Sequence, residues 1–130
     1  MTLHHTVHPD GTEPLPKFLA TLDPKLRQKL LTQLHLLTRN PNLGEPHVKH
    51  FTISKYARFY ELRTRSKQMV RIIFVLLPDG SALLLEPFIK RHQRNTMQAL
   101  EASLATLRQI ESGEICVREL GLHRLWEAVR

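Results

Sequence analysis

The stretch MVRIIFVLL, residues 69–77, decides the fold, because it is apolar at every position except Arg71. A short run of this kind, rich in β-branched and aromatic residues, is typical of a strand that lies inside a sheet and is covered on both faces. The turn sequence PDG follows at residues 78–80, and residues 82–88 form a second run that is apolar except for Glu86. The two runs are therefore expected to pair as an antiparallel hairpin.

Upstream of the hairpin, the sequence predicts a strand over residues 59–64, a lead-in over residues 48–52 and a first strand over residues 3–8. Two helices are expected between the first strand and the others, over residues 16–22 and 24–39. The longer helix has a good start, because Asp23 can accept hydrogen bonds from its first free N–H groups and Pro24 suits its first position. One face of this helix is apolar and consists of Leu26, Leu30, Leu34 and Leu37.

After the hairpin, Asn95 is expected to cap a third helix, with Gln98 completing a capping box three residues later. The apolar face of this helix runs to Ile110, and Ser112-Gly113 ends it. In the tail, Cys116 has no activating neighbour in the sequence and is expected to be buried. A short amphipathic tail helix is predicted from the apolar residues Leu122, Leu125, Trp126 and Val129.

This order of elements predicts a small α+β domain, with a mainly antiparallel central sheet, two N-terminal helices and one C-terminal helix. Residues 1–112 are interpreted as the domain and residues 113–130 as an extension packed on it. The 130 residues are 42% hydrophobic and 24% charged, which indicates a folded chain rather than a disordered one.

Several classes of protein do not fit the sequence. The apolar runs fall short of the roughly 18 residues that a membrane-spanning helix needs, and the first residues lack the cationic and apolar regions of a signal peptide. The single cysteine is typical of a reducing compartment. We therefore expect a cytoplasmic protein that does not enter a membrane.

The net charge of +7 is confined to the middle third of the chain. Residues 49–94 carry +7, whereas residues 1–48 carry +1 and residues 95–130 carry −1. A localised excess of this kind is typical of a surface that binds a polyanion.

Within this basic segment, the two-residue period of a strand places Glu61, Arg63 and Arg65 on one face, with Tyr60 and Leu62 on the other. Arg71 comes from the neighbouring strand, where an unpaired buried charge would be costly. Arg71 therefore pairs with Glu61, contacts a phosphate, or does both. Arg65 lies at a turn, where a solvated hairpin charge is the alternative to a contact with the polyanion. The remaining candidate cations are Lys49, Lys55, Lys90, Arg91 and Arg94.

Lys90, Arg91 and Arg94 form a basic rim directly after the second hairpin strand. His92 is the one imidazole within this rim, which makes it a candidate acid or base. The N-terminal histidines His4, His5 and His8 are not accompanied by Cys, Asp or Glu at ligand spacing, so no metal is expected. The sequence has neither a phosphate-cradling glycine loop nor a nucleophile elbow, so no cofactor is expected.

Three short motifs follow one another in the chain: FYELR at residues 59–63, VRIIF at residues 70–74 and LLLEPFIKR at residues 83–91, before the capped helix. Their order and spacing resemble the RelE/HigB toxin superfamily, and within it the phage-derived host-inhibition (HigB-like) branch of type II toxin–antitoxin systems. The resemblance covers about residues 14–110.

The chain departs from the pattern of that branch at four places. Val70 stands where an aromatic residue is common, and Glu86-Pro87 replaces a frequent glycine. Arg91 and His92 replace lysine and threonine. These changes preserve the basic character of the surface, but they do not identify which residues transfer protons.

The resemblance implies a small RelE-like fold and a metal-independent endoribonuclease, an mRNA interferase that cuts translated mRNA on the ribosome by attack of the 2′-hydroxyl. Arg63, Arg71 and Arg91 would hold the phosphate, with electrostatic support from Lys90. His92 would protonate the leaving oxygen. Glu61 would be the base or, in our interpretation, the residue that orients an arginine. The expected RNA-binding residues are Lys49, Lys55, Tyr56, Tyr60, Arg65 and Arg94, with a tyrosine ring stacked on a base.

The same resemblance implies three partners: mRNA, the ribosome and a small cognate antitoxin, expected to be a helix-turn-helix protein. The antitoxin would bury the basic rim or the apolar tail around Trp126. Two other functions fit the basic surface. A binding module would hold RNA or the ribosome without cutting it, and a protein-interaction domain would dock an acidic partner.

Overall fold

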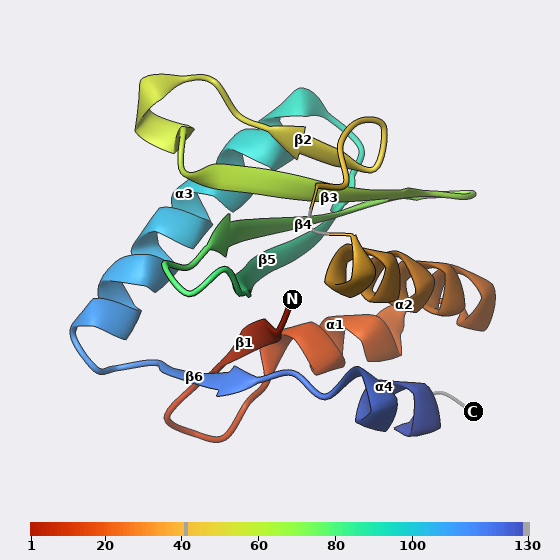
Figure 1. Ribbon diagram of the computed structural model, residues 1–130, viewed down its shortest axis with the longest axis horizontal. Helices are drawn as coiled ribbons and strands as arrows, with labels where there is room; N and C mark the ends of the chain where they lie inside the picture. The colour runs from red at the N-terminus through yellow and green to blue at the C-terminus, as the bar shows by residue number, and fades with distance from the viewer. Residues whose placement is uncertain (41, 129–130) are drawn as a thin grey trace.

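The computed structural model describes residues 1–40 and 42–128. It is a three-layer arrangement, with one sheet between two groups of helices (Figure 1). In chain order the elements are β1 (Leu3–Val7), α1 (Pro14–Thr21), α2 (Pro24–Arg39), β2 (Val48–His50), the short 3-10 helix η1 (Ser54–Tyr56), β3 (Phe59–Arg65), β4 (Met69–Leu76), β5 (Ala82–Lys90), α3 (Gln93–Glu111), β6 (Cys116–Glu119) and α4 (Leu122–Ala128).

The sheet has the strand order β2-β3-β4-β5-β1-β6. All neighbours are antiparallel except β1 and β5, which are parallel. The predicted hairpin is confirmed as β4 and β5, joined by a turn in which Gly80 has φ +85°. The apolar strand β4 lies between β3 and β5 and is almost entirely buried, as its sequence predicts.

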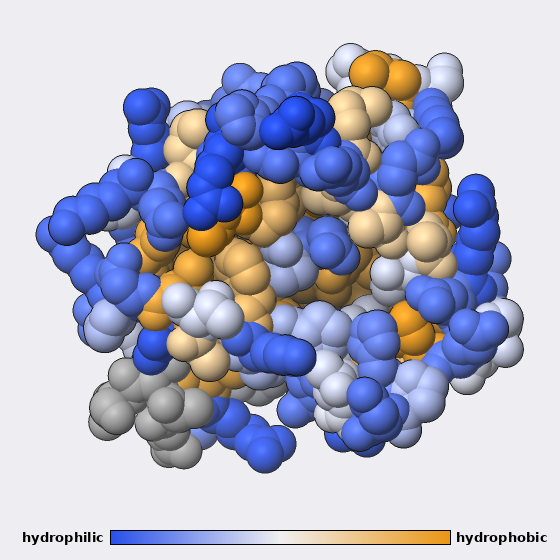
Figure 2. Space-filling view, turned by 180° about the vertical axis from the view of Figure 1, so that it is seen from behind, coloured by the Kyte–Doolittle hydropathy of each residue, from blue (hydrophilic) through white to orange (hydrophobic). Residues whose placement is uncertain are grey.

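Two hydrophobic cores lie on the two faces of the sheet. On one face, the leucines of α1 and α2 pack against β3, β4 and β5 through residues such as Leu62, Ile72 and Leu84. On the other face, α3 packs against Phe59, Ile73 and other residues of the same strands. Seen from behind, the molecule is mostly hydrophilic, and hydrophobic residues reach the surface around a central hollow (Figure 2). The two cores therefore define an α2 side and an α3 side of the sheet.

The predicted N-terminus of α2 is confirmed, because Asp23 accepts a hydrogen bond from the Leu26 N–H at 3.0 Å and Pro24 begins the helix. The predicted N-cap of α3 is wrong by three residues. The helix begins at Gln93 with His92 as its N-cap, and Asn95 lies in the first turn. The Asn95 side-chain oxygen accepts from the backbone N–H groups of Arg91 and His92, at 2.9 and 2.8 Å. Asn95 therefore fixes the entry to α3 from inside the helix.

The tail contains one strand that the sequence does not predict. β6 pairs with β1 at the edge of the sheet, and its residues are exposed. Cys116 is exposed on this strand, so the expectation that it is buried is wrong. The predicted tail helix is present as α4, and Trp126 packs against the α1–α2 core. Val129, which the prediction included, lies outside the described residues.

No α-helix in the described part of the chain is both long enough and apolar enough to cross a membrane.

Candidate functional site

The middle strands carry a row of cations on the α3 side of the sheet. Arg63 of β3 lies directly opposite Arg71 of β4, and Arg65 lies opposite Met69, which in turn pairs with Lys90 of β5. Paired residues on neighbouring strands point to the same face. We call this surface the arginine face and define it by Lys49, Glu61, Arg63, Arg65, Arg71 and Lys90.

Glu61 lies at the centre of the arginine face and holds two of its arginines. Its Oε1 accepts a hydrogen bond from Arg63 Nε at 2.9 Å and lies 3.5 Å from Arg71 Nε. The side chain of Glu61 is 1% exposed, and that of Arg63 is 25% exposed. A buried carboxylate needs such partners, and here it positions two guanidinium groups side by side. Of the two roles expected for Arg71, the contact with Glu61 is therefore present.

Arg71 is the most buried cation of the face, with 9% of its side chain exposed. Its Nη1 donates to the Val70 carbonyl at 3.1 Å. Burial lowers the pKa of the Arg71 guanidinium, and the charge of Glu61 counteracts this. In the described part of the chain, Glu61 Oε2 and Arg71 Nε are buried without a hydrogen-bond partner. These two polar atoms are therefore incompletely satisfied inside the arginine face.

The remaining predicted residues of the basic rim lie where β5 passes into α3. Lys90 ends β5 and is half-buried, whereas Arg91, His92 and Arg94 are exposed. The backbone of Arg91 and His92 is held by Asn95, while their side chains extend into solvent. The structure thus places this rim next to the arginine face through the pairing of Lys90 with Met69.

The two tyrosines that sequence reasoning offers for base stacking do not lie on the arginine face. Tyr60 points to the α2 side, where its ring is stacked against those of His50 at 4.4 Å and Phe74 at 5.4 Å. Tyr56 is buried, and its hydroxyl donates to Glu101 of α3 at 3.0 Å. Period-two alternation places Tyr60 correctly, but it cannot show that Tyr56 belongs to η1 and to the core.

The two remaining lysines among the candidates differ in their surroundings. Lys49 of β2 lies opposite Glu61 of β3 in the strand register, and its Nζ lies 5.4 Å from the centre of the Phe51 ring. Lys55 Nζ donates to Glu101 at 2.6 Å, so this lysine ties η1 to α3 rather than facing the arginines. Lys49 is therefore part of the arginine face, and Lys55 is not.

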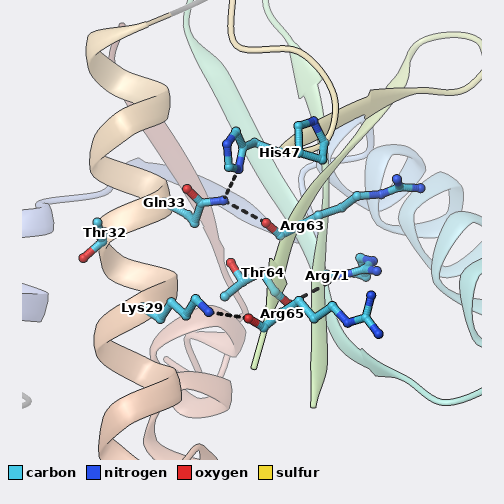
Figure 3. Close-up of a pocket in the computed structure, with 9 residues that line it drawn as sticks. Lys29, Thr32, Gln33, His47, Arg63, Thr64, Arg65 and Arg71 are labelled. Atoms are coloured by element: carbon cyan, nitrogen blue, oxygen red, sulfur yellow. Dashed lines mark hydrogen bonds between the residues drawn. The ribbon is translucent and has the colours of Figure 1, made fainter. Parts of the chain in front are cut away.

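A pocket of about 480 Å³ opens beside the arginine face, between α2 and the edge of β3. Figure 3 shows Lys29 and Gln33 reaching from α2 toward β3, while the guanidinium groups of Arg63, Arg65 and Arg71 extend away from α2. Sequence reasoning missed Gln33, although one signal was present. It is a polar residue on the buried face of α2, next to Leu30 and Leu34, and it is 9% exposed.

Glu86 is a second residue that sequence reasoning did not select. It pairs with Ile73, in the row of the sheet that also contains Glu61, and it lines a hollow of about 270 Å³ under the first turns of α3. Burial raises the pKa of its carboxyl group. The register between β4 and β5 shifts between Ile73 and Phe74. Because of this shift, strict two-residue alternation along β5 would assign Glu86 to the wrong face of the sheet.

The described residues contain no group of three or more His, Cys, Asp or Glu side chains placed to hold a metal ion. Apart from Glu61, the charged groups of the arginine face are cations, and cations bind anions rather than metals.

This small α+β domain, which presents cations of neighbouring strands on one sheet face, is broadly consistent with a RelE-like fold. The model of the family described as phage derived protein Gp49-like (DUF891), a RelE-like toxin family, matches residues 17–109, and the chain belongs to this family. None of the curated proteins matches the chain. The match contains the arginine face and α2 but neither β1 nor β6. Membership of a toxin–antitoxin family implies an antitoxin partner.

Proposed function

We propose that this protein is the toxin of a type II toxin–antitoxin system, of the HigB-like branch, and that it is a ribosome-dependent, metal-independent mRNA endoribonuclease. One observation carries the proposal. Arg63 and Arg71 lie opposite each other on β3 and β4, and both are within 3.5 Å of one buried carboxylate oxygen of Glu61. Two guanidinium groups fixed in this way suit a phosphate whose negative charge grows during reaction.

The reaction needs no external nucleophile. The 2′-oxygen attacks the neighbouring phosphorus in line with the bond to the 5′-oxygen of the next nucleotide. That P–O bond breaks, and its electron pair stays on the 5′-oxygen. The products are a 2′,3′-cyclic phosphate and a 5′-hydroxyl, after one proton leaves the 2′-hydroxyl and another reaches the 5′-oxygen. The protein has to align the strand and stabilise the charge, which accounts for several kcal/mol in comparable sites.

In the proposed site, Arg63 and Arg71 hold the scissile phosphate, and Arg91 approaches it from the exposed rim. Lys90 adds positive charge from the end of β5. His92, exposed at the N-cap of α3 with its backbone N–H held by Asn95, protonates the leaving oxygen. Glu61 acts as the orienting residue. Arg65, Lys49 and Arg94 bind the RNA backbone on either side of the scissile phosphate.

The proposed antitoxin is a small helix-turn-helix protein. It neutralises the toxin by covering the basic rim or the apolar surface around Trp126, which is partly buried on α4. The division of the chain into a toxin domain of residues 1–112 and an extension of residues 113–130 is part of this proposal.

A specific observation favours one alternative, a module that binds RNA or the ribosome without cutting. Glu61 is almost fully buried, with its Oε1 against two arginines, so it is poorly placed to take a proton from a 2′-hydroxyl. Cleavage then depends on a different general base, and a protein without such a base would bind RNA or the ribosome but would not cut.

Expression in a bacterial host separates the two functions. Induction without an antitoxin should arrest growth, and transcriptome-wide mapping of 5′ ends should reveal new ends inside translated reading frames. Arrest with no new ends would support the binding module. New ends that are equally frequent in untranslated RNA would contradict ribosome dependence, and normal growth with unchanged RNA would contradict the toxin.

A further inference from the structure

The pocket beside the arginine face lies where β2 ends and β3 continues. The pairing of β2 with β3 stops at Val48 and Leu62, and the Arg63 N–H donates to the His47 carbonyl at 2.8 Å. Beyond that point, the edge of β3 has α2 rather than a strand beside it (Figure 3). The pocket occupies this gap, and its volume of about 480 Å³ lies within the range of small-ligand sites.

Side chains of α2 replace the missing strand. Gln33 Nε2 donates to the Arg63 carbonyl at 2.9 Å, and Lys29 Nζ donates to the Arg65 carbonyl. Because a carbonyl can only accept, the amide nitrogen of Gln33 must face β3. The same nitrogen lies 2.9 Å from His47 Nδ1, which therefore accepts and leaves the ring proton on Nε2. The amide oxygen of Gln33 remains as an acceptor without a partner among the described residues.

Thr64 supplies a second unused polar group. It is 2% exposed, and its Oγ1 is buried without a hydrogen-bond partner in the described part of the chain. Figure 3 shows its side chain pointing from β3 toward α2, between Gln33 and Lys29. An orphaned hydroxyl in the wall of a pocket indicates a ligand atom that satisfies it.

We infer that this pocket binds one nucleobase of the RNA whose phosphates lie on the arginine face, and that Thr64 and Gln33 read the edge of that base. The inference rests on the proposed function to the extent that RNA is the polyanion. Arg63, Arg65 and Arg71 contribute to the lining and carry their guanidinium groups away from α2, so the pocket and the guanidinium groups that would bind phosphate lie on the two sides of the same part of β3.

The chemistry of the lining fits a base. Lys29 lines the pocket, and its charge disfavours a cationic ligand. Pro46 and the methyl groups of Thr32 and Thr64 offer apolar surface to a flat ring. The Gln33 oxygen accepts from an amino or imino group, and the Thr64 hydroxyl donates to a ring nitrogen or carbonyl. Every nucleobase has such groups, but in different positions, so the pocket confers a preference at one nucleotide.

The test uses short single-stranded 2′-O-methyl RNAs that differ in one base, since the methyl group blocks 2′-oxygen attack and leaves binding alone to be measured. Wild-type protein should prefer one base at one position. Thr64→Val keeps the shape and removes the hydroxyl, and it should reduce that preference about five- to tenfold. Thr64→Ser should retain it.

Thr96→Val is the matched control. Thr96 is also 2% exposed with an orphaned hydroxyl, but it belongs to α3 and not to the pocket. Because neither hydroxyl has a partner in the free protein, both valine variants should have a melting temperature at or above that of the wild type. Only Thr64→Val should change the base preference.

The outcomes separate this inference from the proposed function. A base preference that survives in Thr64→Val, or the absence of any preference in the wild type, overturns the pocket and leaves the nuclease in place. A preference that depends on Thr64 in a protein that cuts no mRNA supports the pocket and contradicts the nuclease.

Discussion

The centre of the arginine face and its rim at the start of α3 carry the same kind of side chain but hold it in opposite ways. Arg71 is buried in a central strand and lies beside the carboxylate of Glu61. Arg94 is exposed in the first turn of α3. A buried, paired arginine side chain is held in one position, and burying it costs desolvation free energy. An exposed arginine side chain stays mobile and hydrated. The centre is therefore suited to positioning a reacting phosphate, and the rim to attracting the strand.

The largest effect is expected at the centre. Arg71→Ala should reduce mRNA cleavage about 10²- to 10³-fold, the loss that follows removal of one fixed donor to a charged transition state. Rates are measured with excess ribosome-bound mRNA, so that weaker binding does not contribute. Arg58→Ala removes an exposed arginine outside the face and should leave the rate unchanged. Equal cleavage rates for the two variants would show that Arg71 does not contribute to catalysis.

Glu61→Gln should have the next largest effect, and mainly on stability. Removing the charge of a buried carboxylate that two arginines share leaves them unpaired, and such changes cost about 3–5 kcal/mol. The free energy of unfolding is measured by urea titration. Glu101→Gln, which removes the charge from the exposed pair with Lys55, should have a much smaller effect on the free energy of unfolding. Similar losses in both variants would contradict the distinction between buried and exposed pairs.

A substitution in the basic rim should change how strongly RNA affinity depends on salt concentration. Arg94→Ala is expected to weaken RNA binding only a few-fold and to reduce the slope of log affinity against log salt by about 0.7, the value for one phosphate contact on a single strand. Fluorescence anisotropy at several salt concentrations measures this slope. Its melting temperature should match that of the wild type, because Arg94 is exposed. An unchanged slope would show that the rim does not touch RNA.

The smallest effect is expected at Glu86. Burial raises the pKa of this carboxyl above its ordinary value of 4.5, so the folded protein holds the proton more tightly than the unfolded chain does. Its ionisation therefore opposes folding increasingly as the pH rises from the ordinary pKa toward the folded-state pKa. Glu86→Gln should raise the melting temperature at neutral pH and leave it unchanged well below pH 4.5. A gain that is the same at both pH values would exclude ionisation as the cause.

The sequence predicts the framework of this molecule well, because hydrophobic periodicity and capping act locally. The β4–β5 hairpin and the whole of α2 follow from such signals. β6 could not be predicted in the same way. It is a short strand exposed at the sheet edge, and its pairing with β1 joins the two ends of the chain.

The candidate site was predictable where strand alternation governs it. Glu61, Arg63 and Arg71 come together because the short connection between β3 and β4 brings the two strands into antiparallel pairing, and their ion pairs follow from that register. The pocket was not predictable, since Gln33 and Thr64 meet only when α2 packs beside the free edge of β3. The burial of Tyr56 likewise depends on a tertiary contact, with Glu101 of α3.

The central claim is that the arginine face cleaves ribosome-bound mRNA by 2′-oxygen attack, and the chemistry of the new ends tests it most directly. Purified protein is added to purified ribosome complexes that hold a defined mRNA, and the ends of the fragments are determined. We predict 5′-hydroxyl and 2′,3′-cyclic phosphate ends in the wild type and a strong loss of both in Arg71→Ala. Fragments with 5′-phosphate ends, or intact mRNA that remains bound to the protein, would contradict the account.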